Sequence, residues 1–197
     1  RVIPSAVDLP PVERLAANRQ PLRLLWIGTP DQRSLLETIR PALEQLGREQ
    51  PQLVLQMVCD EPASFGPLKV ETLDHTPQNI ERSIRQCHVG LWPFDLAQPG
   101  PELTPQPLLR FMAHGMAWIG SDGGEVRRIC EDGFRLRGLT ARTPPQWIGA
   151  LSRLIRDRDM IRRMGLEGRA HVEREHAPRS VVSRLGRLLR PDGCGEG

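Results

Sequence analysis

Short apolar runs alternate with amphipathic helical segments along most of the chain, and this alternation limits the folds open to it. Five apolar runs predict strands, near residues 23–28, 53–58, 69–73, 89–93 and 117–120. Segments with hydrophobic residues at helical spacing separate most of these runs, in the order β-α-β-β-α-β-α-β-α. Such an order favours a mainly parallel sheet with helices on both faces. We therefore predict a Rossmann-like α/β fold.

The expected helices have recognisable boundaries. A first helix carries Leu36 and Leu43 on one face and contains Pro41, which predicts a kink. Further helices are expected over residues 76–87, 107–115 and 124–133. From Pro144 onward only helical patterns remain, so the last third of the chain should be helical, with a frayed tail at residues 191–197.

Composition excludes several classes of protein. The chain has 197 residues, 39% of them hydrophobic, and its apolar runs are far shorter than the roughly 20 residues that span a bilayer. No succession of charged, apolar and small residues opens the sequence, so we expect no signal peptide. Because the first residue is Arg1 and not Met, we expect a segment upstream.

The charge pattern argues against a nucleic-acid binder. The formal net charge is +3, and arginine alternates with acidic residues through most of the chain. The four Trp and four Phe are scattered, whereas nucleic-acid surfaces interleave basic and aromatic residues on one face. Residues 151–190 are the exception, with eleven Arg against five acidic residues, so an anionic membrane surface stays open as a partner.

Cysteine and histidine spacing predicts no metal site. Cys59, Cys87, Cys130 and Cys194 form no CxxC pair, which indicates reduced thiols in a cytoplasmic protein. His171 and His176 are five residues apart, and we expect their side chains to diverge around a helix. We therefore expect neither a metal ion nor a cofactor.

Ligands of doubly wound sheets bind at the carboxyl ends of the strands, so the loops after Gly28, Asp74, Phe94 and Gly120 are the places to search. The loop after Gly28 reads GTPDQ and lacks GxGxxG, and no GxxxxGK[ST] occurs. Dinucleotide oxidoreductases and P-loop NTPases are therefore excluded. Gly28 and Thr29 stand where a phospho-receiver domain would need acidic residues, which excludes that class as well.

Taken together, five segments resemble one family in order and spacing: VIPSAVD (2–8), IGTPD (27–31), residues 90–115, SDGGEVRRICEDG (121–133) and residues 156–173. They are similar to the carboxyl-terminal lobe of the GT-B-fold glycosyltransferases of family 4, also called group 1. The family's entry segment reads like VIPNGVD, and its donor segment like E-x-F-G-x-x-x-x-E-A-M-A-x-G. Glu102, Met112, Ala113 and Gly115 match the donor segment, whereas Arg110 stands in place of its second glutamate.

The resemblance implies the nucleotide-sugar donor-binding lobe of a retaining, hexosyltransferase-type enzyme that acts on a glycan, lipid-linked or small-molecule acceptor. Residues 1–22 would be the segment between two lobes and residues 23–190 the donor lobe. The acceptor lobe would lie outside this sequence, so the lobe alone should be inactive, with no catalytic residue assigned to it. The resemblance further implies polysaccharide biosynthesis in the cytoplasm, peripheral to the inner face of the membrane.

The resemblance also implies a set of donor-binding residues. Glu102 would accept hydrogen bonds from sugar hydroxyls, and the loop amides of Leu103, Thr104 and Gln106 would face the diphosphate. Gly28 would allow close backbone approach.

Two arginines leave alternatives open. Arg33 is either a cation beside the diphosphate or a solvated residue of the first helical turn. Arg110 either meets a phosphate or marks a degenerate lobe that has lost donor binding and acts as a scaffold or partner subunit.

Overall fold

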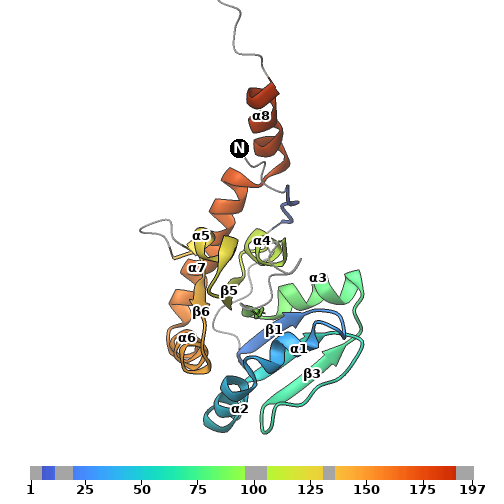
Figure 1. Cartoon of the computed structure of the whole chain (residues 1–197), viewed down its shortest axis with the longest axis vertical. Helices are drawn as coiled ribbons and strands as arrows, with labels where there is room; N and C mark the ends of the chain where they lie inside the picture. The colour runs from blue at the N-terminus through green and yellow to red at the C-terminus, as the bar shows by residue number, and fades with distance from the viewer. Residues whose placement is uncertain (1–5, 12–19, 96–105, 131–135, 190–197) are drawn as a thin grey trace, which may run out of the picture.

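A computed structural model describes residues 6–11, 20–95, 106–130 and 136–189 of the chain. Its strands are all parallel and form one six-stranded sheet in the order β3-β2-β1-β4-β5-β6 (Figure 1). They are β1 (Arg23–Ile27), β2 (Val54–Val58), β3 (Lys69–Leu73), β4 (Val89–Trp92), β5 (Ala117–Ser121) and β6 (Leu139–Ala141). The predicted Rossmann-like α/β fold is confirmed.

The sequence did not reveal β6. This strand has three residues, two of them only partly buried, and it pairs with β5 at the edge of the sheet. A run as short as Leu-Thr-Ala has no period that separates it from a loop. The predicted order of elements therefore lacked its last strand.

Helices cover both faces of the sheet and make up the last third of the described chain. They are α1 (Arg33–Glu37), α2 (Arg40–Glu49), α3 (Pro77–Gln86), α4 (Gln106–Ala113), α5 (Gly124–Cys130), α6 (Pro144–Arg156), α7 (Arg158–Glu175) and α8 (Pro178–Leu189). α7 and α8 form the elongated end of the molecule (Figure 1). In the part of the chain that the structure describes, no helix is long and apolar enough to cross a membrane. The expected end of α5 at residue 133 and the tail 191–197 lie outside the described residues.

The predicted kinked helix around Pro41 is instead two helices. α1 ends at Glu37, and α2 starts at Arg40 with Pro41 in its first turn. Proline is tolerated there because the amide it lacks would have no partner inside the helix. The proline therefore starts a helix rather than bending one.

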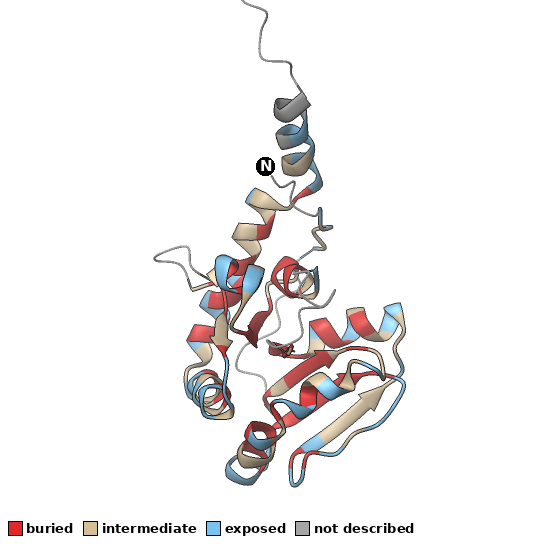
Figure 2. Cartoon of the chain, viewed as in Figure 1, coloured by how far each residue is buried: buried red, intermediate tan, exposed pale blue. Residues whose placement is uncertain are grey.

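The core lies in two layers, one on each face of the sheet. Leu24 and Trp26 of β1 point into the layer under α1, α2 and α6, while Leu25 points into the layer under α3 and α4. This alternation follows from the two-residue period of a strand. Figure 2 shows the buried residues along the strands and on the helix sides that face them, with exposed residues on the outer sides. Every residue of β2, β4 and β5 is buried.

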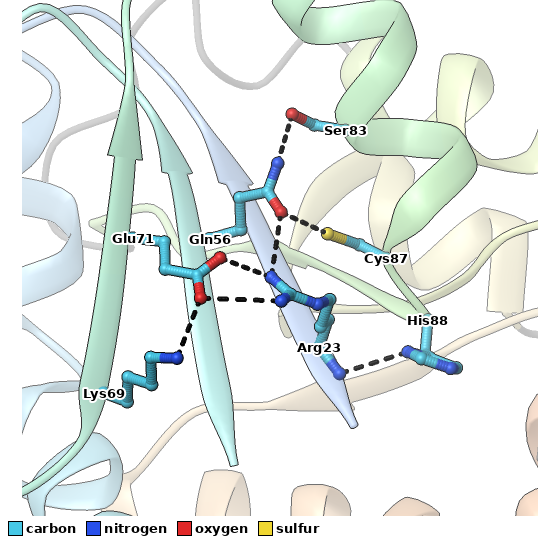
Figure 3. A network of polar contacts seen from close by, with 7 residues as sticks. All are labelled: Arg23, Gln56, Lys69, Glu71, Ser83, Cys87 and His88. Carbon is cyan, nitrogen blue, oxygen red and sulfur yellow. Dashed lines mark hydrogen bonds and ion pairs between the residues drawn. The ribbon is translucent and has the colours of Figure 1, made fainter. Parts of the chain in front are cut away.

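A polar network lies under α3, toward the amino ends of β1 and β4 (Figure 3). Gln56 Nε2 donates to Ser83 Oγ at 2.6 Å, and Arg23 Nη1 lies 2.5 Å from Glu71 Oε2. The hydrogen bond from Arg23 lowers the pKa of Glu71, and burial raises the pKa of the nearby Cys87 thiol to about 12. These groups are satisfied by one another, which indicates a structural role.

The two histidines expected to diverge lie side by side. The ring centroids of His171 and His176 are 5.4 Å apart, with the rings tilted by 54°. α7 ends at Glu175, and His176 has φ −121° and ψ −3°, so its side chain leaves the helical path. The helical spacing argument failed because the helix stops between the two residues.

The end of α4 packs closely on α7 through two glycines. Gly115 follows α4 with a φ of +68°, and Met116 N donates to Phe111 O at 2.9 Å to close the helix. A Cβ placed on Gly165 of α7 would lie 2.0 Å from the carbonyl oxygen of Gly115. Because that contact is with backbone, no side-chain rotation can relieve it.

We expect Gly165→Ala to lower the free energy of unfolding by about 1–3 kcal/mol, the usual effect of overpacking a close contact. Gly149→Ala is the matched control, because this helical glycine of α6 is exposed and a Cβ there meets nothing within 4 Å. The free energy of unfolding of the control should rise by about 0.5–1 kcal/mol, because alanine has a higher helix propensity than glycine. Urea unfolding followed by circular dichroism measures both, and equal stability of the two variants would refute the contact.

Candidate functional site

The direction in which strands are added to the sheet reverses at β1. The chain builds outward from β1 to β2 and β3, then returns and continues on the other side with β4, β5 and β6. β1 therefore pairs with both β2 and β4. Loops that leave the carboxyl ends of β1 and β4 turn to opposite sides at such a switch point and leave a crevice between them.

A pocket of about 730 Å³ lies at this point. It opens at the carboxyl ends of β1 and β4, between α3 and α4. The lining residues come from four parts of the chain: Ala6, Val7, Asp8, Leu9 and Pro10; Ile27, Gly28, Thr29 and Gln32; His75, Ile80, Glu81 and Trp92; and Gln106, Pro107, Arg110, Phe111 and His114.

The turn after β1 forms the floor of the pocket. Gly28 N donates to Val58 O at 3.2 Å, which continues the β1–β2 ladder one residue beyond the strand. A Cβ on Gly28 would lie 2.4 Å from the indole ring of Trp26. Packing against Trp26 thus requires a glycine at position 28. A glycine there would also let a ligand approach the backbone closely. Thr29 and Gln32 then close a turn through Gln32 N and Thr29 O at 3.0 Å.

One face of α4 and the residue after it form a second wall. Gln106, Arg110 and His114 are spaced four residues apart, so they form a single stripe along this wall. The opposite side of α4 is anchored in the core by Leu108 and Met112, both fully buried. The helix therefore presents polar side chains to the pocket from a rigid support.

The first turns of α3 form the third wall. Thr76 caps the helix by accepting a hydrogen bond from Asn79 N at 3.2 Å, and Pro77 occupies its first turn. This start places Glu81 opposite α4. Glu81 Oε1 lies 2.6 Å from Arg110 Nη2, and its Oε2 lies 3.5 Å from His114 Nε2.

The charges of this wall shift two pKa values. Burial lowers the pKa of His114 below 6.5, and the positive charge of Arg110 adds to the shift while Glu81 opposes it. Burial alone would raise the pKa of Glu81, but the hydrogen bond from Arg110 and the nearby positive charges outweigh it. The pKa of Glu81 therefore lies below 4.5, and its carboxylate is ionised at neutral pH.

The segment at residues 6–10 completes the pocket and is held by α7. Val7 N donates to His176 O at 2.9 Å, and Arg169 Nη1 donates to Pro10 O at 2.8 Å. Arg169 Nη1 also donates to Ala113 O at the end of α4. One guanidinium thus joins the entry segment to α4.

Two features of the lining bear on its chemistry. Trp92 is 6% exposed, and its indole Nε1 has no hydrogen-bond partner among the described residues. Within the described ranges, no three His, Cys, Asp or Glu side chains gather as a metal site would require. Within this lining, Glu81 and Arg110 form an ion pair.

The structure brings together three of the residues predicted for donor binding. Gly28, Gln106 and Arg110 all line the pocket. Arg33 does not line it: its guanidinium donates to Pro62 O at 3.1 Å and lies 3.2 Å from Glu61. Glu102, Leu103 and Thr104 lie outside the described residues. Their roles stay predictions.

Sequence reasoning missed Glu81, His114 and Trp92 as pocket residues. Trp92 lies in a predicted strand, near 89–93, and ends β4 beside the switch point, so its position was a usable signal. Glu81 is 29 residues from Arg110 in the chain, and nothing in either segment indicates their pairing. They meet only because α3 and α4 lie on the two sides of the same pocket.

No protein-family model matches the sequence, and no curated protein matches it. Solved structures do match. Sucrose-phosphate synthase from Thermosynechococcus elongatus superposes with a TM-score of 0.68 at 20% identity, over 96% of this chain and 52% of that one. Anabaena HepE in complex with UDP and glucose gives 0.66 at 13% identity, over 85% and 48%.

A third structure is the C-terminal domain of a glycosyl transferase group 1 family protein from Francisella tularensis. It gives a TM-score of 0.61 at 15% identity, over 79% of this chain and 87% of that one. The chain therefore spans about half of the first two structures and most of the third. The likeness shows that it has the fold of a lobe of the GT-B glycosyltransferases.

The lowered pKa of His114 predicts that the free energy of unfolding depends on pH. Below pH 6.5 the unfolded chain binds a proton at this residue before the folded chain does, so stability should fall as the pH drops from 7 to 5. His114→Gln removes this contribution and should flatten the dependence. Urea unfolding at pH 7, 6 and 5 compares the two proteins, and identical slopes would contradict the neutral, buried state of His114.

Proposed function

We propose that this chain is the nucleotide-sugar donor-binding lobe of a glycosyltransferase. The observation that carries the proposal is the pocket of about 730 Å³ at the switch point of the sheet. Its volume is in the range of small-molecule sites, and its place is where ligands of doubly wound sheets bind. HepE, about half of which superposes on this chain, was solved with UDP and glucose.

The walls offer groups suited to the parts of such a ligand. The backbone at Gly28 and the start of α4 at Gln106 both face the pocket, and free amides at a helix start attract a diphosphate. Pro107 removes one of these amides. Glu102 and the loop at residues 103–106, as the family resemblance implies, would complete the site.

We further propose that the acceptor binds elsewhere, on a second lobe. The chain spans 52% of sucrose-phosphate synthase but 87% of the isolated C-terminal domain from Francisella tularensis. Transfer with retention to a glycan, lipid-linked or small-molecule acceptor would take place between the two lobes. The isolated chain would then bind donor without turning it over.

The alternative is a degenerate lobe that serves as a scaffold or partner subunit. Among the described lining residues the only guanidinium is that of Arg110, and Glu81 already pairs with it at 2.6 Å. Asp8 adds a second carboxyl group to the same lining. With one guanidinium against two carboxyl groups, the described walls offer no net positive charge to a diphosphate, and a binding measurement must decide.

We expect UDP, GDP or ADP to bind the chain, and to slow amide exchange at Gly28 and through the first turn of α4. Isothermal titration calorimetry measures the binding, and hydrogen-exchange mass spectrometry locates it. Arg33→Ala tests whether that residue belongs to the site, because its side chain bonds to the β2–β3 loop instead. If none of the three nucleotides binds at millimolar concentration, the scaffold alternative holds.

A further inference from the structure

The ion pair between Glu81 and Arg110 is open to the pocket. Each side chain is 39% exposed, both line the cavity, and they approach from opposite walls, α3 and α4. His114, whose side chain is 9% exposed, lies behind them at 3.5 Å from Glu81. A ligand in the pocket therefore meets a carboxylate that is held in place but only partly enclosed.

The hydrogen-bonding capacity of this pair is not used up. A carboxylate has about four lone-pair positions on its two oxygens, and among the described residues Glu81 has one short hydrogen bond, from Arg110, and one longer contact, with His114. The remaining positions can accept from hydroxyl groups. Two neighbouring hydroxyls on a sugar ring can donate to the two oxygens of one carboxylate, which makes such a diol a suitable ligand.

The same pair is poorly suited to bind phosphate. Arg110 already donates to Glu81, and an anion that approached Arg110 would meet the charge of that carboxylate. Neutral hydroxyls carry no such penalty, and each bond to an ionised acceptor is stronger than one to a neutral acceptor. The wall therefore selects the sugar parts of a nucleotide sugar rather than its diphosphate.

We propose that Glu81 accepts hydrogen bonds from vicinal hydroxyls of the bound nucleotide sugar, and that Arg110 positions it for this contact. The inference rests on the proposed function, since it names the part of the donor that this wall recognises. The hydroxyls come from either the ribose or the transferred sugar, and the choice of probes separates the two.

The test compares Glu81→Gln with the unchanged chain, using UDP, 2′,3′-dideoxy-UDP and UDP-glucose as probes in calorimetry. If the ribose is the source, the variant should bind UDP about tenfold more weakly and lose nothing for dideoxy-UDP. If the transferred sugar is the source, UDP binding should be unchanged and UDP-glucose binding about tenfold weaker. Either result supports the role of Glu81.

Glu71→Gln is the matched control. Glu71 is also a partly exposed acid paired with an arginine, Arg23, but it belongs to the network under α3 and does not line the pocket. It should leave all three affinities unchanged. If Glu81→Gln does not fold, Glu81→Asp replaces it, because it keeps the charge beside Arg110 and withdraws the oxygens by one methylene.

Two outcomes overturn the inference while the proposed function stands. The first is that the unchanged chain binds UDP and UDP-glucose, and the Glu81 variant binds each of them as tightly as the unchanged chain does. The second is that the variant loses dideoxy-UDP as strongly as UDP, which would mean that the pocket itself has changed. If the unchanged chain binds none of the probes, the proposed function fails, and this inference fails with it.

Discussion

The parallel pairing of β1 with a strand on each side determines most of this structure. Leu24 and Leu25 are both fully buried although they point to opposite faces, so both faces of the sheet must be covered. Parallel neighbours cannot be joined by tight turns, and the helices that connect them supply that cover. The reversal at β1 then opens the crevice that holds the pocket. Fold and site are thus consequences of one pairing arrangement.

Sequence patterns predicted the parts of the fold that depend on local hydrophobicity. The five longer strands and the helical last third followed from apolar runs and helical spacing, because burial on this scale needs nonpolar residues at regular positions. β6 was missed because a strand of three residues, two of them only partly buried, carries no period. The family resemblance supplied Gln106 and Arg110, which line the same pocket as Gly28, and their use in donor binding stays a prediction. Glu81 was not predicted, since its place depends on how α3 and α4 lie on the two sides of the pocket.

The chain uses the same pair of residue types for two different purposes. Arg23 and Glu71 lie in a network with Gln56 and Lys69, and their partners are all within the protein. Arg110 and Glu81 make a pair of similar geometry on the wall of a cavity. The first pair links β1 to β3 across β2. The second leaves acceptor capacity toward a space that a ligand can enter, so position in the fold, and not residue type, separates structure from recognition.

The contact between Gly115 and Gly165 also determines which wall of the pocket can move when a ligand binds. With backbone against backbone, α4 has no side chain between itself and α7 that could be compressed or rotated at this point. Arg169 adds a second attachment through Ala113. Because Arg169 also holds Pro10, a ligand larger than the cavity would gain its room on the side of α3. The stripe formed by Gln106, Arg110 and His114 acts as the fixed reference against which a bound molecule is aligned.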